Sequence, residues 1–309
     1  TRTGLSTPIS VAVGAGRMAV AERGSNRVVV YDRIPKAGEP APVPSVVLGQ
    51  RDFESSAAGC GAFGLSQPWG VAITPDGKLI VADVGNSRVL VWNRIPAPGS
   101  AAPAPSLVLG QSDVDHCQIA DDNQDGHSER DPGTSLITSR ITGRIMSPMS
   151  VWSDGARLVV ADNGFERVLI WNSFPTTNFQ PADVVLGQPD FTTRFPNGAS
   201  NRGEVRTPTA RTFQGARYVH SDGTSMAVAD IGNNRVLIWS SFPQANYQPA
   251  DIVLGHAGFE QAATHDLDQD GNADVPSAQV LGAPTAVLFT PSALFVSDYL
   301  FNRVLRFGQ

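Results

Sequence analysis

Two short acidic stretches have the residue types and the spacing that bind calcium. One is DDNQDGHSERD, from Asp121 to Asp131, and the other is DLDQDGNAD, from Asp266 to Asp274. Both follow the pattern D-x-[DN]-x-D-G-x-x-[DE], in which oxygen ligands alternate before a glycine that turns the chain around the ion. The pattern predicts two Ca²⁺ sites. The predicted ligands are Asp121, Asn123, Asp125, His127 and Glu129 in the first stretch, and Asp266, Asp268, Asp270, Asn272 and Asp274 in the second.

Each stretch resembles only the front half of an EF-hand loop. In such a loop the seventh residue binds through its carbonyl, a role that falls to His127 and Asn272. The twelfth position, which normally holds a bidentate glutamate, is occupied by Pro132 and Ser277. We therefore expect weak binding, with a Kd on the order of 10⁻⁴ M. Two solvated turns without metal are the alternative, because Asp, Asn and Gly also form turns. Mg²⁺ fits less well, because it prefers fewer protein ligands.

A second pattern recurs five times along the chain. In each copy an acid precedes an arginine by five positions, as in VADVGNSRVLVW from Val81 to Trp92. The acids are Glu22, Asp83, Asp162, Asp230 and Asp298, and the arginines are Arg27, Arg88, Arg167, Arg235 and Arg303. A carboxylate and a guanidinium at the ends of two strands can pair and fix the turn between them. We expect this pair to be structural rather than catalytic.

Each copy of this pattern lies within a series of short β-strands. A proline opens each copy, at Pro8, Pro68, Pro148, Pro208 and Pro284, and four copies end in a further apolar run: SVVLGQ from Ser45, SLVLGQ from Ser106, DVVLGQ from Asp183 and DIVLGH from Asp251. The strands are apolar on both faces and no amphipathic helix is visible, so each sheet must be covered on both sides. Sheets stacked around an axis satisfy this requirement. The sequence predicts an all-β fold, a five-bladed β-propeller of mostly four antiparallel strands, with six blades as the alternative.

The chain resembles the NHL-repeat β-propeller family, and within it bacterial secreted proteins. The resemblance is carried by the P-x-x-V start, the D-G hairpin and the V-A-D-x-G-N-x-R-V core, best seen from Pro68 to Val89. It covers almost the whole chain, but the loops are longer than the family's usual ones and the family usually has six blades. The fifth copy has no fourth strand before Gln309. Residues 1–5, a three-stranded last blade or further sequence would complete the ring.

The repeats predict one propeller domain over residues 1–309, interrupted by two calcium-type insertions at 113–145 and 257–280. Both cysteines follow a V-L-G-Q strand, Cys60 by ten residues from Gln50 and Cys117 by six from Gln111. These loops belong to adjacent copies and should emerge on the same rim. We expect a disulfide between them, and the alternative is two free thiols.

An active site in a propeller would lie at the mouth of the central channel, which the first strands line. The third residue after each copy's proline is Val11, Val71, Val151, Arg211 and Val287. Arg211 is therefore a candidate for binding an anion or carboxylate in the channel. The same stretch adds Arg217, Tyr218 and His220, and we take Arg211, Tyr218 and His220 as catalytic candidates. The alternative is that an insertion shifts this alignment and leaves Arg211 on the surface.

The histidines do not repeat the zinc site known in one relative of this family. NHL-like propellers include a peptide-amidating lyase that binds zinc through histidines and also binds calcium. The five histidines here are His116, His127, His220, His256 and His265, and no three of them occupy equivalent positions on first strands. The zinc ligands therefore cannot be transferred, although zinc or another transition metal is left open.

Composition narrows the classes of partner. The chain has 309 residues, 41% of them hydrophobic, and a net charge of -6, which disfavours binding to nucleic acid or to an anionic membrane. No run of eighteen apolar residues is present, so we expect no membrane span. We predict a monomeric, calcium-stabilised propeller that is secreted, periplasmic or on the cell surface and that binds a protein, peptide or glycan. A metal-dependent lyase or hydrolase at the channel mouth is the alternative.

Overall fold

The computed structural model describes residues 4–40, 42–118, 145–201, 203–263 and 276–308. The chain forms two compact units, which are described separately below. The first comprises Thr1–Leu158 with Trp171–Pro181, and the second comprises Val159–Ile170 with Ala182–Gln309. The prediction of one domain over residues 1–309 stays a prediction.

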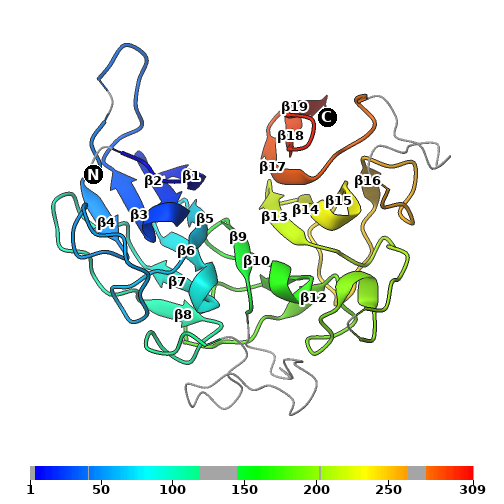
Figure 1. The fold of residues 1–309 in the computed structure, drawn as a ribbon, viewed down its shortest axis with the longest axis horizontal. Coiled ribbons are helices and arrows are strands. Elements are labelled where there is room, and N and C mark those ends of the chain that lie inside the picture. The colour runs from blue at the N-terminus through cyan, green and yellow to red at the C-terminus, as the bar shows by residue number, and fades with distance from the viewer. Residues whose placement is uncertain (1–3, 41, 119–144, 202, 264–275, 309) are drawn as a thin grey trace. The chain divides into compact units, whose positions relative to one another are not determined.

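The described residues form five antiparallel sheets in chain order (Figure 1). The first sheet contains β1 (Pro8–Gly14), β2 (Arg17–Glu22), β3 (Arg27–Tyr31) and β4 (Val46–Leu48). The second contains β5 (Pro68–Ile73), β6 (Leu79–Asp83), β7 (Arg88–Trp92) and β8 (Leu107–Leu109). The third contains β9 (Pro148–Ser153), β10 (Leu158–Asp162), β11 (Arg167–Trp171) and β12 (Val184–Leu186). The fourth contains β13 (Ala216–Ser221), β14 (Met226–Asp230), β15 (Arg235–Trp239) and β16 (Ile252–Leu254). The fifth contains β17 (Pro284–Thr290), β18 (Ala293–Asp298) and β19 (Arg303–Gly308).

These sheets are the blades of a β-propeller, so the predicted fold class and the predicted number of blades are confirmed. Each four-stranded sheet keeps the sequence order of its strands, as a meander does. The described residues contain no α-helix, only three-residue 3₁₀ turns. Val, Leu and Ile fill the third strands β3, β7, β11 and β15, whose residues are all buried. β-branched and large apolar residues suit a sheet that is covered on both faces.

Neighbouring blades pack through their first strands. In the first unit β1 lies against β5 and β5 lies against β9, while in the second unit β13 lies against β17. The hydrophobic core of the first unit joins two blades through residues such as Val28, Leu48, Val81 and Leu90, all at most 1% exposed. Within each unit, these blades therefore bury one face against a neighbour.

A tight turn joins the second and third strands of every blade. Each acid is followed by a three-residue turn and then by one residue with positive φ, directly before the arginine. These residues are Asn26 (φ 47°), Ser87 (52°), Glu166 (54°), Asn234 (52°) and Asn302 (49°). Asparagine tolerates this left-handed conformation better than most residues with a side chain, which explains its frequency here.

The predicted pair of acid and arginine forms across this turn within each blade. The arginine Nε lies 2.8–3.0 Å from a carboxylate oxygen in all five copies. In the first four copies both side chains are at most 2% exposed, whereas Arg303 in the fifth is 22% exposed. A buried guanidinium has to use its other donors as well, because an unpaired one carries a large desolvation cost.

The remaining donors bind backbone carbonyls from two loops. A glutamine or histidine stands two residues after each fourth strand. Nη1 donates to the carbonyl of the third residue beyond it, which is Phe53, Val114, Phe191 or Phe259. Nη2 of Arg88 donates to Gly61 and Gly64, and Nη2 of Arg235 donates to Thr209 and Thr212. The arginine thus ties the third strand both to the loop that enters its blade and to the loop that leaves it.

A glycine and a glutamine follow the fourth strand in the first three blades, and both hold the turn before the arginine in place. The Nε2 atoms of Gln50 and Gln188 donate to the carbonyl of the residue before the arginine, at 2.8 and 3.1 Å. The glycine before the glutamine has positive φ, for example 87° at Gly187. A Cβ on Gly187 would lie 2.7 Å from the oxygen of Glu166, so the close approach of these two backbones requires glycine.

Candidate functional site

The structure corrects the predicted position of Arg211. This residue is not on a first strand, because β13 begins only at Ala216. Arg211 lies in an exposed turn, where its Nη1 donates to the carbonyl of Tyr247 and its guanidinium lies 5.5 Å from the centre of the Tyr247 ring. Tyr247 in turn donates its N–H to Val185 of β12, the outermost strand of the preceding blade. The alternative reading, in which an insertion shifts the alignment, is correct.

A backbone hydrogen bond to the acid of the acid–arginine pair shows where the first strand of the fourth blade starts. The second carboxylate oxygen of Asp83 accepts the N–H of Ser66, two residues before Pro68. Asp230 accepts the N–H of Gln214 in the same way, at 2.7 Å, which puts Ala216 where the other blades have proline. The sequence contains this information, because the first strand starts fourteen or fifteen residues before the acid in every blade. Counting back from Asp230, rather than forward from Pro208, would have found it.

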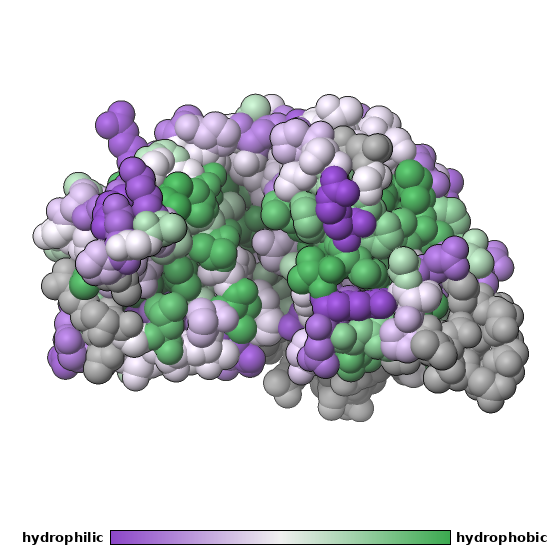
Figure 2. Space-filling view, turned by 90° about the horizontal axis from the view of Figure 1, so that it is seen from above, coloured by the Kyte–Doolittle hydropathy of each residue, from purple (hydrophilic) through white to green (hydrophobic). Residues whose placement is uncertain are grey.

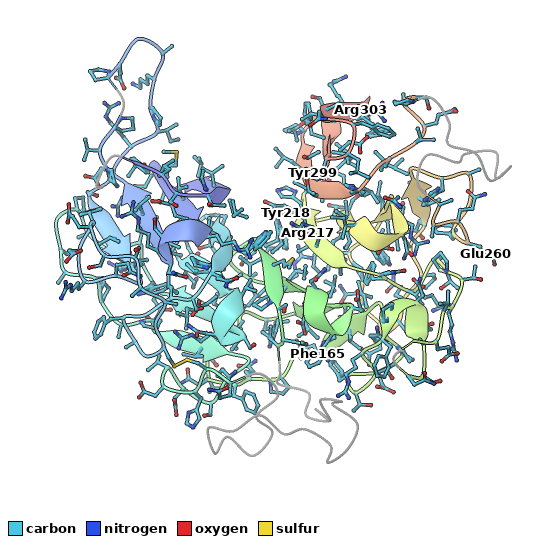
Figure 3. The ribbon with its side chains drawn as sticks, viewed as in Figure 1. Phe165, Arg217, Tyr218, Glu260, Tyr299 and Arg303 are labelled. Carbon is cyan, nitrogen blue, oxygen red and sulfur yellow. A yellow bond between two sulfur atoms is a disulfide. The ribbon has the colours of Figure 1, made fainter. Side chains whose placement is uncertain are left out.

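Tyr218 and His220 share β13 and face the neighbouring blade of the second unit. They are two residues apart and therefore point to the same side of the sheet. Tyr218 packs against the core that contains Val287 and Leu294. The His220 ring lies 6.2 Å from the Phe289 ring, and its Nδ1 accepts the N–H of Phe289 at 3.2 Å. Figure 3 shows Arg217 and Tyr218 together on β13. The structure brings Tyr218 and His220 together but does not bring Arg211 to them.

Burial keeps His220 neutral at physiological pH. Loss of solvent around the half-buried imidazole lowers its pKa to about 4, although the negative charge of Asp222 acts to raise it. Because Nδ1 accepts a hydrogen bond, the neutral ring carries its proton on Nε2. His220 and Tyr218 thus present an uncharged surface of aromatic rings between two blades. Their catalytic role stays a prediction.

The first strands also expose apolar side chains. On β1, Val11 and Val13 are 58% and 52% exposed, and on β17 Leu288 is 48% exposed. The residues equivalent to Val11 on the two following blades, Val71 and Val151, are only 5% and 7% exposed. Figure 2 shows hydrophobic side chains gathered at the surface of the face that it views. Sequence patterns did not distinguish these positions, because their residue types are those of buried strands.

The predicted calcium ligands lie outside the described residues. This holds for all ten, from Asp121 to Glu129 and from Asp266 to Asp274. Described residues lie on both sides of each stretch, namely Asp113–Gln118 and Ile145 around the first and Ala257–Ala263 and Pro276–Val280 around the second. Within the part of the chain that the structure describes, no three His, Cys, Asp or Glu side chains are grouped closely enough to hold a metal ion. Two Ca²⁺ sites stay a prediction.

The predicted disulfide between Cys60 and Cys117 is confirmed. It joins the loop after β4 to the loop after β8, with the two Cα atoms 6.1 Å apart. Beside it, Gly61 donates its N–H to the carbonyl of Val114 at 3.1 Å, and that carbonyl also accepts Nη1 of Arg88. The bond closes a separation of 57 residues, for which chain entropy gives a stabilisation of ~4 kcal/mol. It therefore holds in place one of the carbonyls that the buried arginine requires.

Glu166 is a titratable residue with a shifted pKa that sequence patterns did not single out. Its carboxylate accepts the N–H of Gly215 before the next blade, as the side-chain oxygen of Asn26 accepts the N–H of Gln67. Burial, helped by the nearby charges of Asp230 and Asp162, raises the pKa of Glu166 to about 7, although the hydrogen bond from Gly215 acts in the opposite direction. A carboxylate thus occupies a position where three of the other blades have a neutral asparagine. We therefore expect this junction between blades to be sensitive to pH.

One segment of the chain matches a known family model. Residues 65–92, which include β5, β6 and β7, match the family model described as NHL repeat. The predicted resemblance to NHL-repeat propellers is confirmed by this match. No protein with a curated description matches the chain. None of the described helical segments has the length and the apolar character that crossing a bilayer requires.

Two solved structures are similar over nearly the whole chain. A chain in the crystal structure of the mitotic checkpoint complex matches with a TM-score of 0.46 and 9% identity, over 97% of this chain and 61% of that one. A chain in the crystal structure of a nidogen/laminin complex matches with a TM-score of 0.46 and 11% identity, over 98% of this chain and 76% of that one. The present chain thus spans less than two thirds of the first of these chains.

The pKa of Glu166 predicts a specific dependence of stability on pH. Because its pKa is higher in the folded than in the unfolded chain, the folded state holds the proton more tightly. Stability from this group is complete below about pH 4.5 and falls until about pH 7, by ~3 kcal/mol, since one pKa unit is about 1.4 kcal/mol. Glu166→Asn and Glu166→Gln should therefore unfold at higher urea concentration than the wild type at pH 8 and at about the same concentration at pH 4.5. An equal difference at both pH values would contradict this assignment.

Proposed function

We propose that this chain is a secreted or cell-surface propeller, stabilised by calcium, that binds a protein, peptide or glycan partner. The observation that carries the proposal is the exposure of Val11, Val13 and Leu288 on strands that otherwise bury such residues. Exposed apolar side chains on a rigid scaffold favour a partner, because covering them removes apolar surface from water. In the second unit, the neutral imidazole of His220 lies on the first strand β13.

The disulfide supports a location outside the reducing cytosol. Disulfides that stabilise a fold persist in oxidising compartments, which include the periplasm and the cell exterior. Cys60 and Cys117 are the chain's two cysteines, and both are used in the bond. The long and exposed connection between β3 and β4, described over residues 32–40 and 42–45, adds a further surface and extends away from the sheets in Figure 1.

Calcium would stabilise the loops that leave the second and fourth blades. Both predicted sites follow the same position in a blade, after β8 and after β16. Each begins shortly after a carbonyl that binds a buried arginine, at Val114 and at Phe259. An ion that orders these loops would therefore favour the bonded arrangement of Arg88 and Arg235. Weak binding would suffice where free calcium is abundant.

Removal of calcium tests this part of the proposal. For a Kd on the order of 10⁻⁴ M, about 10 mM Ca²⁺ should stabilise the native state by ~3 kcal/mol for each site. We expect the melting temperature to rise from EDTA to Ca²⁺, and to rise less in Asp125→Ala and in Asp270→Ala. Glu54→Ala, an exposed acid outside both loops, serves as the control and should respond like the wild type. A melting temperature that does not differ between EDTA and Ca²⁺ would show that the loops are solvated turns.

Binding is tested by screening labelled protein on glycan and peptide arrays. We expect saturable binding to members of one of these classes. Val13→Lys should weaken binding at least tenfold, because it places a charge on the exposed apolar surface of β1. Val205→Lys is the matched control, because Val205 is 95% exposed in a loop and should not affect binding. Absence of any saturable ligand, or an equal loss in both variants, would contradict the proposal.

A further inference from the structure

The loop that leaves each of the first four blades begins at one buried polar side chain, two residues after the fourth strand. In the first three blades this residue is Gln50, Gln111 or Gln188, and in the fourth blade it is His256. All four are at most 8% exposed, so their polar atoms need partners inside the protein. The change from glutamine to histidine therefore alters the hydrogen bonds of the fourth blade.

Glutamine at this position uses both N–H groups of its amide to join two backbone segments. One N–H of Nε2 binds the carbonyl of the residue before the buried arginine, which is Asn26, Ser87 or Glu166. The other binds a carbonyl seven residues further along the loop, at Ala57, Gln118 or Phe195, over 2.8–2.9 Å. The amide thus ties the start of the loop to the turn of the acid–arginine pair.

His256 makes only one contact of this kind. Its Nε2 lies 2.8 Å from the carbonyl oxygen of Asn233. Because a carbonyl only accepts, Nε2 carries the proton of the neutral ring and Nδ1 holds a lone pair. Nδ1 is buried and has no hydrogen-bond partner within the part of the chain that the structure describes. The second carbonyl, seven residues further along, is that of Ala263, and no described residue donates to it.

The loop nevertheless takes the same course past His256 as in the first blade. The side-chain amide of Asn234 donates to the carbonyl of Ala262 at 3.1 Å, as that of Asn26 donates to Ser56 at 2.9 Å. Both acceptors directly precede the residue seven positions after the side chain at the start of the loop. The carbonyl of Ala263 thus follows a fixed point of the loop and corresponds to a carbonyl that glutamine binds.

The surroundings of the imidazole keep it neutral at neutral pH. Burial lowers the pKa of His256 below its ordinary value, and the positive charge of Arg235 also lowers it, although the hydrogen bond to Asn233 acts to raise it. The ring therefore gains a second N–H only in acid.

Few other charged groups face this ring from the described elements around it. Arg235 is itself paired with Asp230, with 2.8 Å between Nε and a carboxylate oxygen. Residues 276–283, which form a bridge to the residue before His256, contain no charged side chain. Glu260, marked in Figure 3, is exposed and is the acid of the described part of the loop. Protonation of the ring is thus governed by burial and by one ion pair.

We propose that His256 is a proton-dependent switch that holds the loop after β16 in acid and releases it at neutral pH. A proton taken up from solvent adds an N–H at Nδ1, so the imidazolium, like a glutamine amide, has two donors that point in different directions. Nε2 keeps the carbonyl of Asn233, and Nδ1 binds the carbonyl of Ala263. In the neutral ring Nδ1 has no hydrogen to donate, and the second contact is lost.

This switch goes beyond the proposed function, because it needs neither a partner nor calcium. The loop that it controls leads to the second predicted calcium stretch, whose first predicted ligand, Asp266, lies three residues after Ala263. The first predicted stretch follows Gln111, whose amide does not titrate. The two loops that carry calcium-type stretches should therefore respond differently to acid.

Hydrogen exchange of the whole protein in EDTA tests the switch. The protection of the backbone amides of residues 257–263, relative to an unfolded chain at the same pH, is measured by mass spectrometry at about pH 8 and about pH 4. We expect protection to rise about fivefold in acid, the effect of one additional hydrogen bond. Residues 51–57, which Gln50 holds at both pH values, are the internal reference and should not change.

His256→Gln separates the switch from other effects of pH. Glutamine is the residue of the first three blades, so the variant should fold. It should raise the protection of residues 257–263 about fivefold at pH 8 and remove its dependence on pH. His116→Gln, in the loop after β8 of the first unit, is the matched control and should behave like the wild type.

The reverse exchange gives an independent result. Gln50→His should transfer the pH dependence to residues 51–57, with protection about fivefold below that of the wild type at pH 8 and recovery in acid. Equal protection of residues 257–263 at both pH values in the wild type, or a pH dependence that persists in His256→Gln, would overturn the proposal. An unchanged protection of residues 51–57 in Gln50→His would do the same.

Discussion

A guanidinium buried in a protein has to be paired and fully hydrogen-bonded, and this requirement organises every blade of the propeller. Arg88 is 0% exposed and binds Asp83 together with the carbonyls of Val114, Gly61 and Gly64. These groups come from the second strand, from the loop that enters the blade and from the loop that leaves it. Because arginine presents its donors in a fixed planar fork, one side chain sets the relative position of all three segments.

The need to pair the buried arginine also explains why the fold could be predicted from the sequence. The acid and the arginine recur at constant spacing, and the strands around them consist of β-branched and apolar residues, so the five blades and their strand order follow directly. The bond between Cys60 and Cys117 could be predicted because both follow the same strand type in adjacent copies.

A spacing of fourteen residues before Asp230 marks Ala216 as the start of a strand, although other blades have proline there. The properties that could not be predicted depend on contacts between distant residues. The pKa of Glu166 depends on burial and on two carboxylates from other segments. The exposure of Val304 follows from the lack of a described strand beside it, although its residue type is that of a core. The calcium loops stay predictions that rest on their sequence pattern.

The most direct test of the role of the arginine compares Arg88→Lys with Arg303→Lys by urea unfolding. Lysine keeps the charge but cannot reach the carbonyls in several directions, and each buried carbonyl left unpaired costs about 1–3 kcal/mol. Arg88 binds three such carbonyls, whereas Arg303 binds one among the described residues and is 22% exposed. We predict a loss of at least about 3 kcal/mol for Arg88→Lys and of about 1 kcal/mol for Arg303→Lys. Equal losses would show that the blades are held by apolar packing alone.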